Sequence, residues 1–600
     1  MCWVGAGADA DHDAGVSVRV GLSTPTPPRR AARRVACDPG SYHARPANAR
    51  ILYTHDRQRR AVGVRCPDGY TRPVRRPTRA ECPLILLMVL ACAPAVVPVA
   101  LAISDAALTQ GAWSDIPMSG ARWVLIARSL WISGLIALLA TLLAIPMAQV
   151  LRRSGARLAA LLLAPLWLPA WLTYAGLNLA RAPDTILGGA ILDAALPDHR
   201  WAIVLLGRAV AIGSLVLWSV PIAALVMAAS DDPDASAAEE LIRTERMLWI
   251  RRAWMRLRLH RAALLTGFGA VFLLTVGSSL PLHLAQIETD AIVLWRAISE
   301  RTPDRWAGVW LGAWPELVIA GLGAAWFVRR MTNRPRPGEG VTPTAPPTIG
   351  RVTRIGAWLV WASAAVLPIT LMAWSLDARS SPAHWLKLNA EALVSSAMIA
   401  AGGGLIAGLA AVLIASAGAS ERSLTRRFAY LMAWGCLFGM LVPGVLVGAA
   451  IAGLGPDLGG APVIASSART LFIAGIAGLI VAGVESPDAR AMRSMDARGD
   501  ALGWLAVHPA RGGRLFAGVW VGAFLLGIHE IEASTLVRPP GSANLPQQML
   551  SDLHYARLEQ LSAGGVVMGT VGIALGIGAS WLLSIRLGQP RADRAVTPPI

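Results

Sequence analysis

The chain has 600 residues, of which 54% are apolar and only 15% are charged, and its mean hydropathy is +0.51. A soluble protein of this length needs far more charge to cover its surface. The apolar residues also form long uninterrupted runs, and about twelve runs of ~22 residues fit the chain, each able to cross ~30 Å of hydrocarbon. The sequence therefore excludes a soluble protein and predicts an all-α, polytopic membrane protein with about 12 transmembrane helices.

The net charge of +18 comes almost entirely from arginine, because Lys387 is the only lysine among 55 basic residues. In a polytopic protein, cytoplasmic retention of positive loops explains such an excess before nucleic-acid binding does. A P-loop ATPase needs a lysine within G-x-x-x-x-G-K-[ST], and Lys387 lies in no such motif. The six cysteines form no C-x-x-C pair. We therefore expect no ATP site, metal site, cofactor, catalytic residue or nucleic-acid partner in this chain.

Residues 1–82 contain fifteen arginines, many prolines and glycines, and no amphipathic period. Such a segment buries too little apolar area to offset the entropy lost on ordering, so we expect it to be disordered. Three interpretations remain open: a basic arm on anionic membrane lipid, an idle tail, or a start codon placed too far upstream.

The hydropathy pattern predicts six spans on each side of a linker rich in proline, glycine and threonine. We expect a first six-span domain over 83–328, a linker over 329–353, a second six-span domain over 354–587 and a tail over 588–600. The predicted spans are 84–104, 122–150, 158–179, 201–229, 263–285, 306–328, 354–376, 391–418, 428–454, 467–484, 514–535 and 561–587.

The distribution of arginine predicts the orientation. If both termini are cytoplasmic, 42 of the 55 basic residues fall in the tails, the linker and the even-numbered loops. This asymmetry is the positive-inside pattern. We therefore expect a multi-pass protein of a bacterial inner membrane with both termini in the cytoplasm.

Short matches between the halves predict an internal repeat. Residues 272–276 (FLLTV) match 524–528 (FLLGI), and Leu166–Pro169 matches Met440–Pro443. Because six is an even number of spans, the two halves enter the membrane in the same direction. The pattern predicts parallel repeats with a translocation path at their interface.

The cytoplasmic loop between the fourth and fifth spans is about thirty residues long in each half, at 230–262 and 486–513. The other cytoplasmic loops within each half are shorter than ten residues. Recurrence at matched positions favours docking of a cytoplasmic partner over a basic loop that merely lies on the membrane surface.

The second of these loops contains Ala491, Met492, Asp496 and Ala497, and Pro509 follows Asp496 after thirteen residues. This pattern resembles the "EAA" loop of ABC importer permeases, although Asp496 stands where that family has glycine. The first loop is more degenerate, since no proline closes it. Its corresponding residues are Ala238, Glu239, Glu240 and His260. The resemblance implies that both sets couple the spans to an ATPase.

The 6+6 layout with a central linker looks like the fused, two-domain iron(III)- and thiamine-type permeases. The resemblance implies the fold of a type I ABC importer permease. It also implies a cytoplasmic ABC ATPase dimer, a periplasmic substrate-binding protein and surrounding lipid as partners, and ferric iron or a similar small solute as cargo.

Four residues are candidates for the translocation path. Glu530 is a carboxylate near the end of the eleventh predicted span, Ser278 is its counterpart in the first half, and Pro169 and Pro443 break matched spans. Glu530 either attracts a cation or pairs at the membrane interface with an arginine such as Arg538. The prolines form either a gate or structural kinks.

Two other classes stay open. An ion-coupled secondary transporter also commonly has 6+6 helices, but it needs titratable groups deep in the bundle and a short loop after the fourth span. A membrane enzyme needs a large outer loop with clustered acids or histidines. The longest outer loop, 536–560, holds only Asp552, His554 and Glu559.

Overall fold

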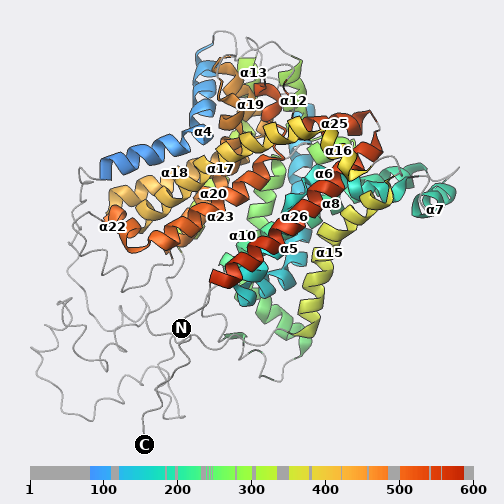
Figure 1. Cartoon of the computed structure of the whole chain (residues 1–600), viewed down its shortest axis with the longest axis horizontal. Helices are drawn as coiled ribbons and strands as arrows, with labels where there is room; N and C mark the ends of the chain where they lie inside the picture. The colour runs from blue at the N-terminus through green and yellow to red at the C-terminus, as the bar shows by residue number, and fades with distance from the viewer. Residues whose placement is uncertain are drawn as a thin grey trace, which may run out of the picture. The chain divides into compact units, whose positions relative to one another are not determined.

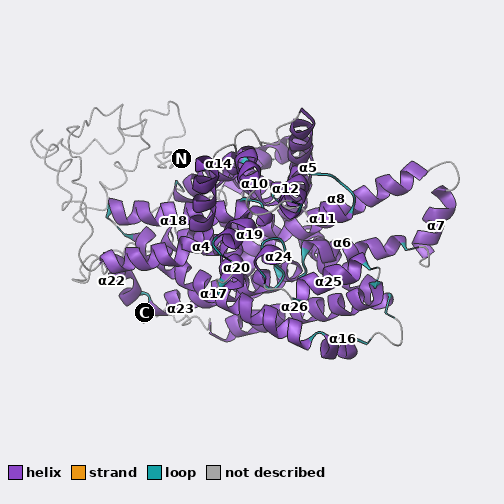
Figure 2. Cartoon of the chain, turned by 90° about the horizontal axis from the view of Figure 1, so that it is seen from above, coloured by secondary structure: helices purple, strands orange, loops and turns teal. Residues whose placement is uncertain are grey.

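In the computed structural model, every element of the described residues is helical, and no strand occurs among them (Figure 2). The structure describes residues 81–586 apart from 110–119, 183–185, 196–199, 231–237, 240–241, 243–244, 246–247, 278–279, 301–305, 334–349, 377–380, 421, 456–458, 484–499, 539–541, 543 and 556. Residues 1–80 of the predicted N-terminal tail therefore lie outside the described residues, as does most of the linker. The last two tail residues, Glu81 and Cys82, already belong to a helix, so the predicted boundary at 82 is two residues too late.

Within the described part of the chain, eight helices are long and apolar enough to cross a membrane, which confirms the all-α, polytopic prediction. They are α4 (Glu81–Leu108), α5 (Gly120–Leu162), α8 (Arg200–Ser230), α10 (Trp249–Val276), α15 (Arg351–Trp374), α17 (Ala390–Ala419), α20 (Ala461–Gly483) and α26 (Leu558–Arg586).

Two bent pairs raise the number of spans to ten if each pair is one span. The first pair is α13 (Trp306–Gly312) and α14 (Trp314–Thr332), bent by 51°, and the second is α18 (Ser423–Leu441) and α19 (Gly444–Gly453), bent by 105°.

The remaining two of the twelve predicted spans, 158–179 and 514–535, are not continuous helices. Residues 158–179 comprise the end of α5, the 3-10 turn η3 (Ala164–Trp167), α6 (Ala170–Asn178) and the first residue of η4 (Leu179–Arg181). Pro165 and Pro169 account for these interruptions, because proline lacks a backbone donor and clashes with the preceding turn. In the other segment, α23 (Pro509–Gly527) ends at Gly527. The count of twelve stays a prediction.

The spans pack into two groups that exchange helices between the halves of the chain. In one group α5, α8 and α10 pack together, and α15 and α26 from the second half lie against α5. In the other, α17, α18, α20 and α23 pack together, and α4 and α14 from the first half lie against α18 (Figure 1). The first and last spans of each half therefore lie in the group formed mainly by the other half, and each half contributes to both groups.

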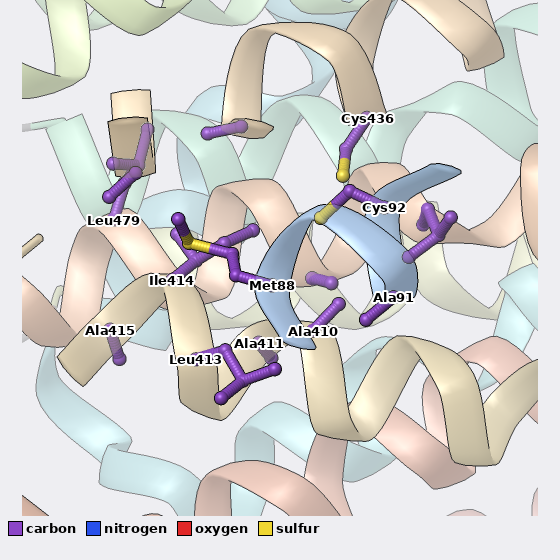
Figure 3. Close-up of a cluster of buried hydrophobic side chains, with 14 of the residues drawn as sticks. Met88, Ala91, Cys92, Ala410, Ala411, Leu413, Ile414, Ala415, Cys436 and Leu479 are labelled. Carbon is purple, nitrogen blue, oxygen red and sulfur yellow. The ribbon is translucent and has the colours of Figure 1, made fainter. Parts of the chain in front are cut away.

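Small residues make the exchanged contacts close. On α4, Met88 and Cys92 lie beside Ala411 and Ile414 of α17, and Cys92 faces Cys436 of α18 (Figure 3). Within the same group, a Cβ at Gly408 of α17 would lie 2.9 Å from the ring of Phe516. In a bilayer, helices associate through such close van der Waals packing rather than through the hydrophobic effect.

Paired side chains identify the two ends of this bundle. At one end, which we call the Glu81 side, buried Glu81 at the start of α4 forms an ion pair with Arg422 at the start of α18. At the other end, the Arg122 side, Arg122 near the start of α5 pairs with Asp290 at 2.9 Å. Five short helices connect spans at the Arg122 side: α11 (Leu280–Leu284), α12 (Asp290–Ser299), α16 (Pro382–Leu388), α24 (Ser534–Val537) and α25 (Leu545–His554). The helix α22 (Asp500–Val507) lies at the Glu81 side. In the chain, α7 (Ile186–Ala195) lies between α6 and α8.

Candidate functional site

The sharpest break in the bundle lies between α18 and α19, at Val442 and Pro443. The last carbonyl groups of a helix have no partner within the helix. Here the guanidinium of Arg469, from the middle of α20, supplies one. Its Nη1 donates to the carbonyl oxygens of Met440 and Val442, each at 2.8 Å. A cation at a helix C-terminus is also favoured by the helix dipole.

Glu532 is the acidic partner of this guanidinium. Its Oε2 lies 3.9 Å from Nη2 of Arg469, and each side chain is only 12% exposed. A largely buried charge in an apolar bundle is costly unless it is paired and hydrogen-bonded. Arg469 therefore ties three segments together: the end of α18, the middle of α20 and the turn that precedes α24.

Glycines let α19 approach that turn. A Cβ at Gly444 would lie 2.6 Å from Cβ of Glu532, and a Cβ at Gly448 would lie 2.6 Å from the backbone oxygen of Ala533. A flexible side chain can move away from a new methyl group, but a backbone oxygen cannot move without shifting the turn. Gly448 is therefore the more demanding of the two positions.

We expect Gly448→Ala to lower the stability of the protein by about 1–3 kcal/mol, the usual cost of overpacking. The control is Gly453→Ala on the same helix, because a Cβ at Gly453 meets nothing within 4 Å. Thermal unfolding of both variants in detergent micelles is the measurement. Equal melting temperatures for the two variants would contradict the packing of α19 on the turn.

The first half has its own break, at Leu168 and Pro169. The turn η3 ends at Trp167, and α6 begins at Ala170. Here the carbonyl oxygen of Leu168 accepts a hydrogen bond of 2.9 Å from Nε1 of Trp218, a side chain of α8. In both breaks, the carbonyl before the proline is thus satisfied by an N–H from the following long span.

Each break faces the end of a helix from the opposite half. A Cβ at Gly277, just after α10, would lie 3.2 Å from the backbone oxygen of Leu441. The imidazole of His529, just after α23, lies beside the backbone of Trp167. We call these two breaks and the two helix ends that face them the central crossing.

The predicted path residues lie in or beside the central crossing. Pro169 and Pro443 are the last residues before α6 and α19, and Glu530 follows His529. Ser278 follows Gly277 but lies outside the described residues.

The carboxylate of Glu530 is held by backbone amides. Its two oxygens accept hydrogen bonds from Ala533 N at 2.7 Å and Ser534 N at 2.8 Å, which caps the first turn of α24. Arg538 instead lies within 3.4 Å of the side-chain oxygen of Gln547. These contacts join Glu530 to α24.

A small cavity of about 10 Å³ with both polar and apolar walls lies beside Glu530, with room for one water molecule or one small ion. Most of its polar lining is oxygen, and Ser466 Oγ is buried there without a hydrogen-bond partner. The polar residues that line it are Ser396, Ser466, Glu530, Ser534, Arg538 and Asn544.

The predicted coupling residues lie at the Glu81 side where the structure describes them. In the first loop, Nε2 of His260 is 4.0 Å from Oε2 of Glu239, so these two residues meet, and Ala238 adjoins Glu239 in a helical turn. In the second loop, Pro509 is the exposed first residue of α23. The other predicted coupling residues, Glu240, Ala491, Met492, Asp496 and Ala497, lie outside the described residues.

The helix α22, which directly precedes Pro509, is anchored in the bundle. Trp504 is fully buried, its ring packs edge-on against His508, and Ser416 of α17 donates a hydrogen bond to the carbonyl of Ala501. Any movement of the preceding loop would therefore be passed to α17 and α23 through packed side chains.

A buried ion cluster at the Arg122 side was not foreseen from the sequence. Arg122 Nε lies 2.9 Å from Oδ1 of Asp290, and its Nη2 lies 3.5 Å from Oε2 of Glu316. The three side chains are 3–7% exposed. They join α5, α12 and α14. By contrast Arg128 and Arg208, the span arginines that stand out by position in the sequence, are exposed.

Among the described residues, no group of three or more His, Cys, Asp or Glu side chains is placed to hold a metal ion. Comparison with family models, with curated proteins and with solved structures gives no match.

Proposed function

We propose that this chain is the transmembrane permease subunit of an ABC importer. It moves a solute delivered by a periplasmic binding protein, and a separate ATPase dimer supplies the energy. The observation that carries the proposal is the central crossing, where each of two proline-broken spans lies against the end of a helix from the opposite half. Broken helices at a repeat interface are the usual site of solute passage in transporters.

The contacts of the central crossing support a relation of the two halves by an approximate twofold axis along the membrane normal. Gly277 faces Leu441, and His529, which is 252 residues further along than Gly277, faces Trp167. Trp167 and Leu441 hold equivalent positions before the two prolines. Such reciprocal contacts are what a twofold axis generates.

Two further pairs support the same relation. Residues 134–140 (GLIALLA) and 404–410 (GLIAGLA) on α5 and α17 differ at one position. On these same helices, Ser129 Oγ accepts a hydrogen bond from the first amide of α12 and Ser396 Oγ accepts one from the first amide of α25, each at 3.0 Å.

The exchange of helices explains how movements of the two halves could be coupled. Because α4 and α14 belong to the second group and α15 and α26 to the first, a rotation of either group pulls on spans of both halves. Rigid-body rotation of packed groups about an interface is a common means of switching. Alternating access through the central crossing follows from such a rotation.

The Glu81 side is the cytoplasmic face in this proposal, because the arginine-rich loops lie there. The ATPases would dock on 230–262 and 486–513, and α22 would transmit their movement. The inner membrane of a bacterium is the corresponding location. The resemblance of the 6+6 layout to the fused iron(III)- and thiamine-type permeases suggests ferric iron, or a similar small solute, as the cargo.

We expect replacement of 486–499 by a Gly/Ser segment of equal length to abolish retention of the ATPase. The replacement stops at 499 because Ala501 and Trp504 are buried, so the bundle itself is left intact. The measurement is co-purification from membranes of the native host, with the ATPase identified by labelling with azido-ATP.

The matched control replaces 336–349 of the central linker by Gly/Ser, which should leave the ATPase bound. An ATPase that the wild-type protein never retains, or that the 486–499 variant retains fully, would refute the proposed function.

A second candidate, an ion-coupled secondary transporter, is favoured by one observation. The cavity beside Glu530 has a mostly oxygen-bearing lining and the size of one small cation, and serine, asparagine and carboxylate oxygens are ligands that hard cations prefer. Reconstituted vesicles discriminate the candidates: solute uptake driven by a sodium or proton gradient, with no nucleotide and no ATPase present, would select the secondary transporter.

A further inference from the structure

A second cavity, of about 270 Å³, opens at the Arg122 side between the two halves of the chain. Its walls come from α11 and α12 of the first half and from α25 of the second. None of these short helices belongs to a span, so the cavity lies outside the apolar part of the bundle. We call it the outer cleft. It adjoins the central crossing, because α11 begins three residues after Gly277.

The polar lining of the outer cleft is basic. His283 and His554 face it from opposite halves, and Arg296 and Ser299 face it from α12. No carboxylate is among its lining residues. Glu288 lies 3.5 Å from Arg296, but these side chains are 58% and 52% exposed, and an exposed ion pair of this kind is worth little and is easily exchanged.

The rest of the lining is apolar. Trp295 is half-buried and lies next to Arg296, and Leu550 lies opposite on α25. Small-molecule sites combine such apolar walls with a few convergent polar groups, and they start near 300 Å³. The volume and the lining of the outer cleft therefore suit a solute of small size with one apolar face.

We propose that the outer cleft binds a small solute that carries a carboxylate or phosphate group, held by Arg296, His283 and His554. This inference rests on the proposed transport function and assigns it an anionic cargo in place of a free ferric ion. It places the first binding site for that cargo at the Arg122 side, directly before the central crossing.

His283 makes this binding depend on pH. Burial, followed by the neighbouring Arg296 and His554, lowers the pKa of His283, so its neutral form predominates near pH 7. A bound anion favours the charged imidazole, so binding takes up a proton and the affinity rises as the pH falls. The other charged groups nearby are Glu288 beside Arg296, and Asp552, which lies 3.9 Å from Arg557.

The test is isothermal titration calorimetry of the purified full-length chain in nanodiscs of phosphatidylcholine. Citrate and inorganic phosphate serve as probes, which separates carboxylate from phosphate recognition, and glucose serves as the uncharged control. We expect at least one of the two anions to bind, about tenfold more tightly at pH 6 than at pH 8, the ratio that one unit of pKa coupling gives. Glucose should not bind.

The variants are Arg296→Gln and the double variant His283→Gln/His554→Gln, with His384→Gln on exposed α16 as the matched control. We expect about tenfold weaker binding in the first two and none of this loss in the control. Absence of anion binding to the wild-type chain at pH 6, or equal affinity in all variants, overturns the inference. Retention of the ATPase by the same preparations is measured separately, so that anion binding and the proposed transport function can each be refuted without the other.

Discussion

Replacing Arg469 by glutamine is expected to lower the stability of the protein by about 3–5 kcal/mol, the range for removing one partner of a buried ion pair. The carbonyl oxygens of Met440 and Val442 lose the donor that holds them at 2.8 Å, and Glu532 loses the cation that faces it. The break between α18 and α19 then has unpaired polar groups inside an apolar bundle. We also expect solute uptake to fall to background, because the same break lies in the central crossing.

The control is Arg208→Gln, which removes an exposed arginine from α8 and should leave the melting temperature within about 2 °C, as for a surface substitution. Arg469→Lys should be intermediate, because an ammonium cannot reproduce the planar fork of the guanidinium. Thermal unfolding in detergent and uptake in reconstituted vesicles are the measurements. A stable Arg469→Gln protein with normal uptake would mean that the break needs no cation.

The positions of the spans were largely predictable, because a continuous apolar run of about twenty residues has few other solutions. The prolines at 169 and 443 also predicted interruptions, since proline cannot continue the backbone hydrogen bonding of a helix. The sequence did not indicate the size of the bend. The two breaks differ in form: one is a bend of 105°, and the other is a 3-10 turn between two helices.

The exchange of helices between the groups could not be predicted from hydropathy. Each span is apolar all round, so the pattern of apolar residues does not indicate which face meets which neighbour. The decisive features are small residues such as Gly408 and Gly448, whose importance depends on the atoms of a distant helix. The near-identity of 134–140 and 404–410 is a stronger indication of the predicted repeat than the match between 272–276 and 524–528.

The candidate path residues stay a prediction, and their polar contacts were not foreseen. Pro443 adjoins Gly277, and Glu530 follows His529, which lies beside Trp167 near Pro169. Arg469 was missed, although it is the one basic residue within an otherwise apolar span, α20. Its partners are the carbonyl groups of Met440 and Val442, which can accept a side-chain hydrogen bond because the helix breaks there. Every residue has the same backbone carbonyl, so the sequence does not indicate which of them Arg469 binds.

The buried cluster of Arg122, Asp290 and Glu316 gives the other large expected effect. Arg122→Met should lower the stability by about 3–5 kcal/mol, because it leaves two carboxyl groups at 4% and 7% exposure without the guanidinium that faces them. Asp290 is also the first residue of α12, so the variant should loosen the wall of the outer cleft. Thermal unfolding in detergent is the measurement, with Arg128→Met on the exposed face of α5 as the control.

The cost of Arg122→Met lies in the stranded carboxyl groups rather than in lost attraction, and this can be tested by removing them. In the triple variant Arg122→Met/Asp290→Asn/Glu316→Gln, neutral side chains replace all three charges, so most of the stability should return. The backbone amide at position 290 still donates to Ser129 Oγ in this variant, because the substitution leaves the backbone of that 3.0 Å hydrogen bond unchanged. A triple variant as unstable as Arg122→Met would show instead that the guanidinium holds α5, α12 and α14 together through contacts that no neutral set replaces.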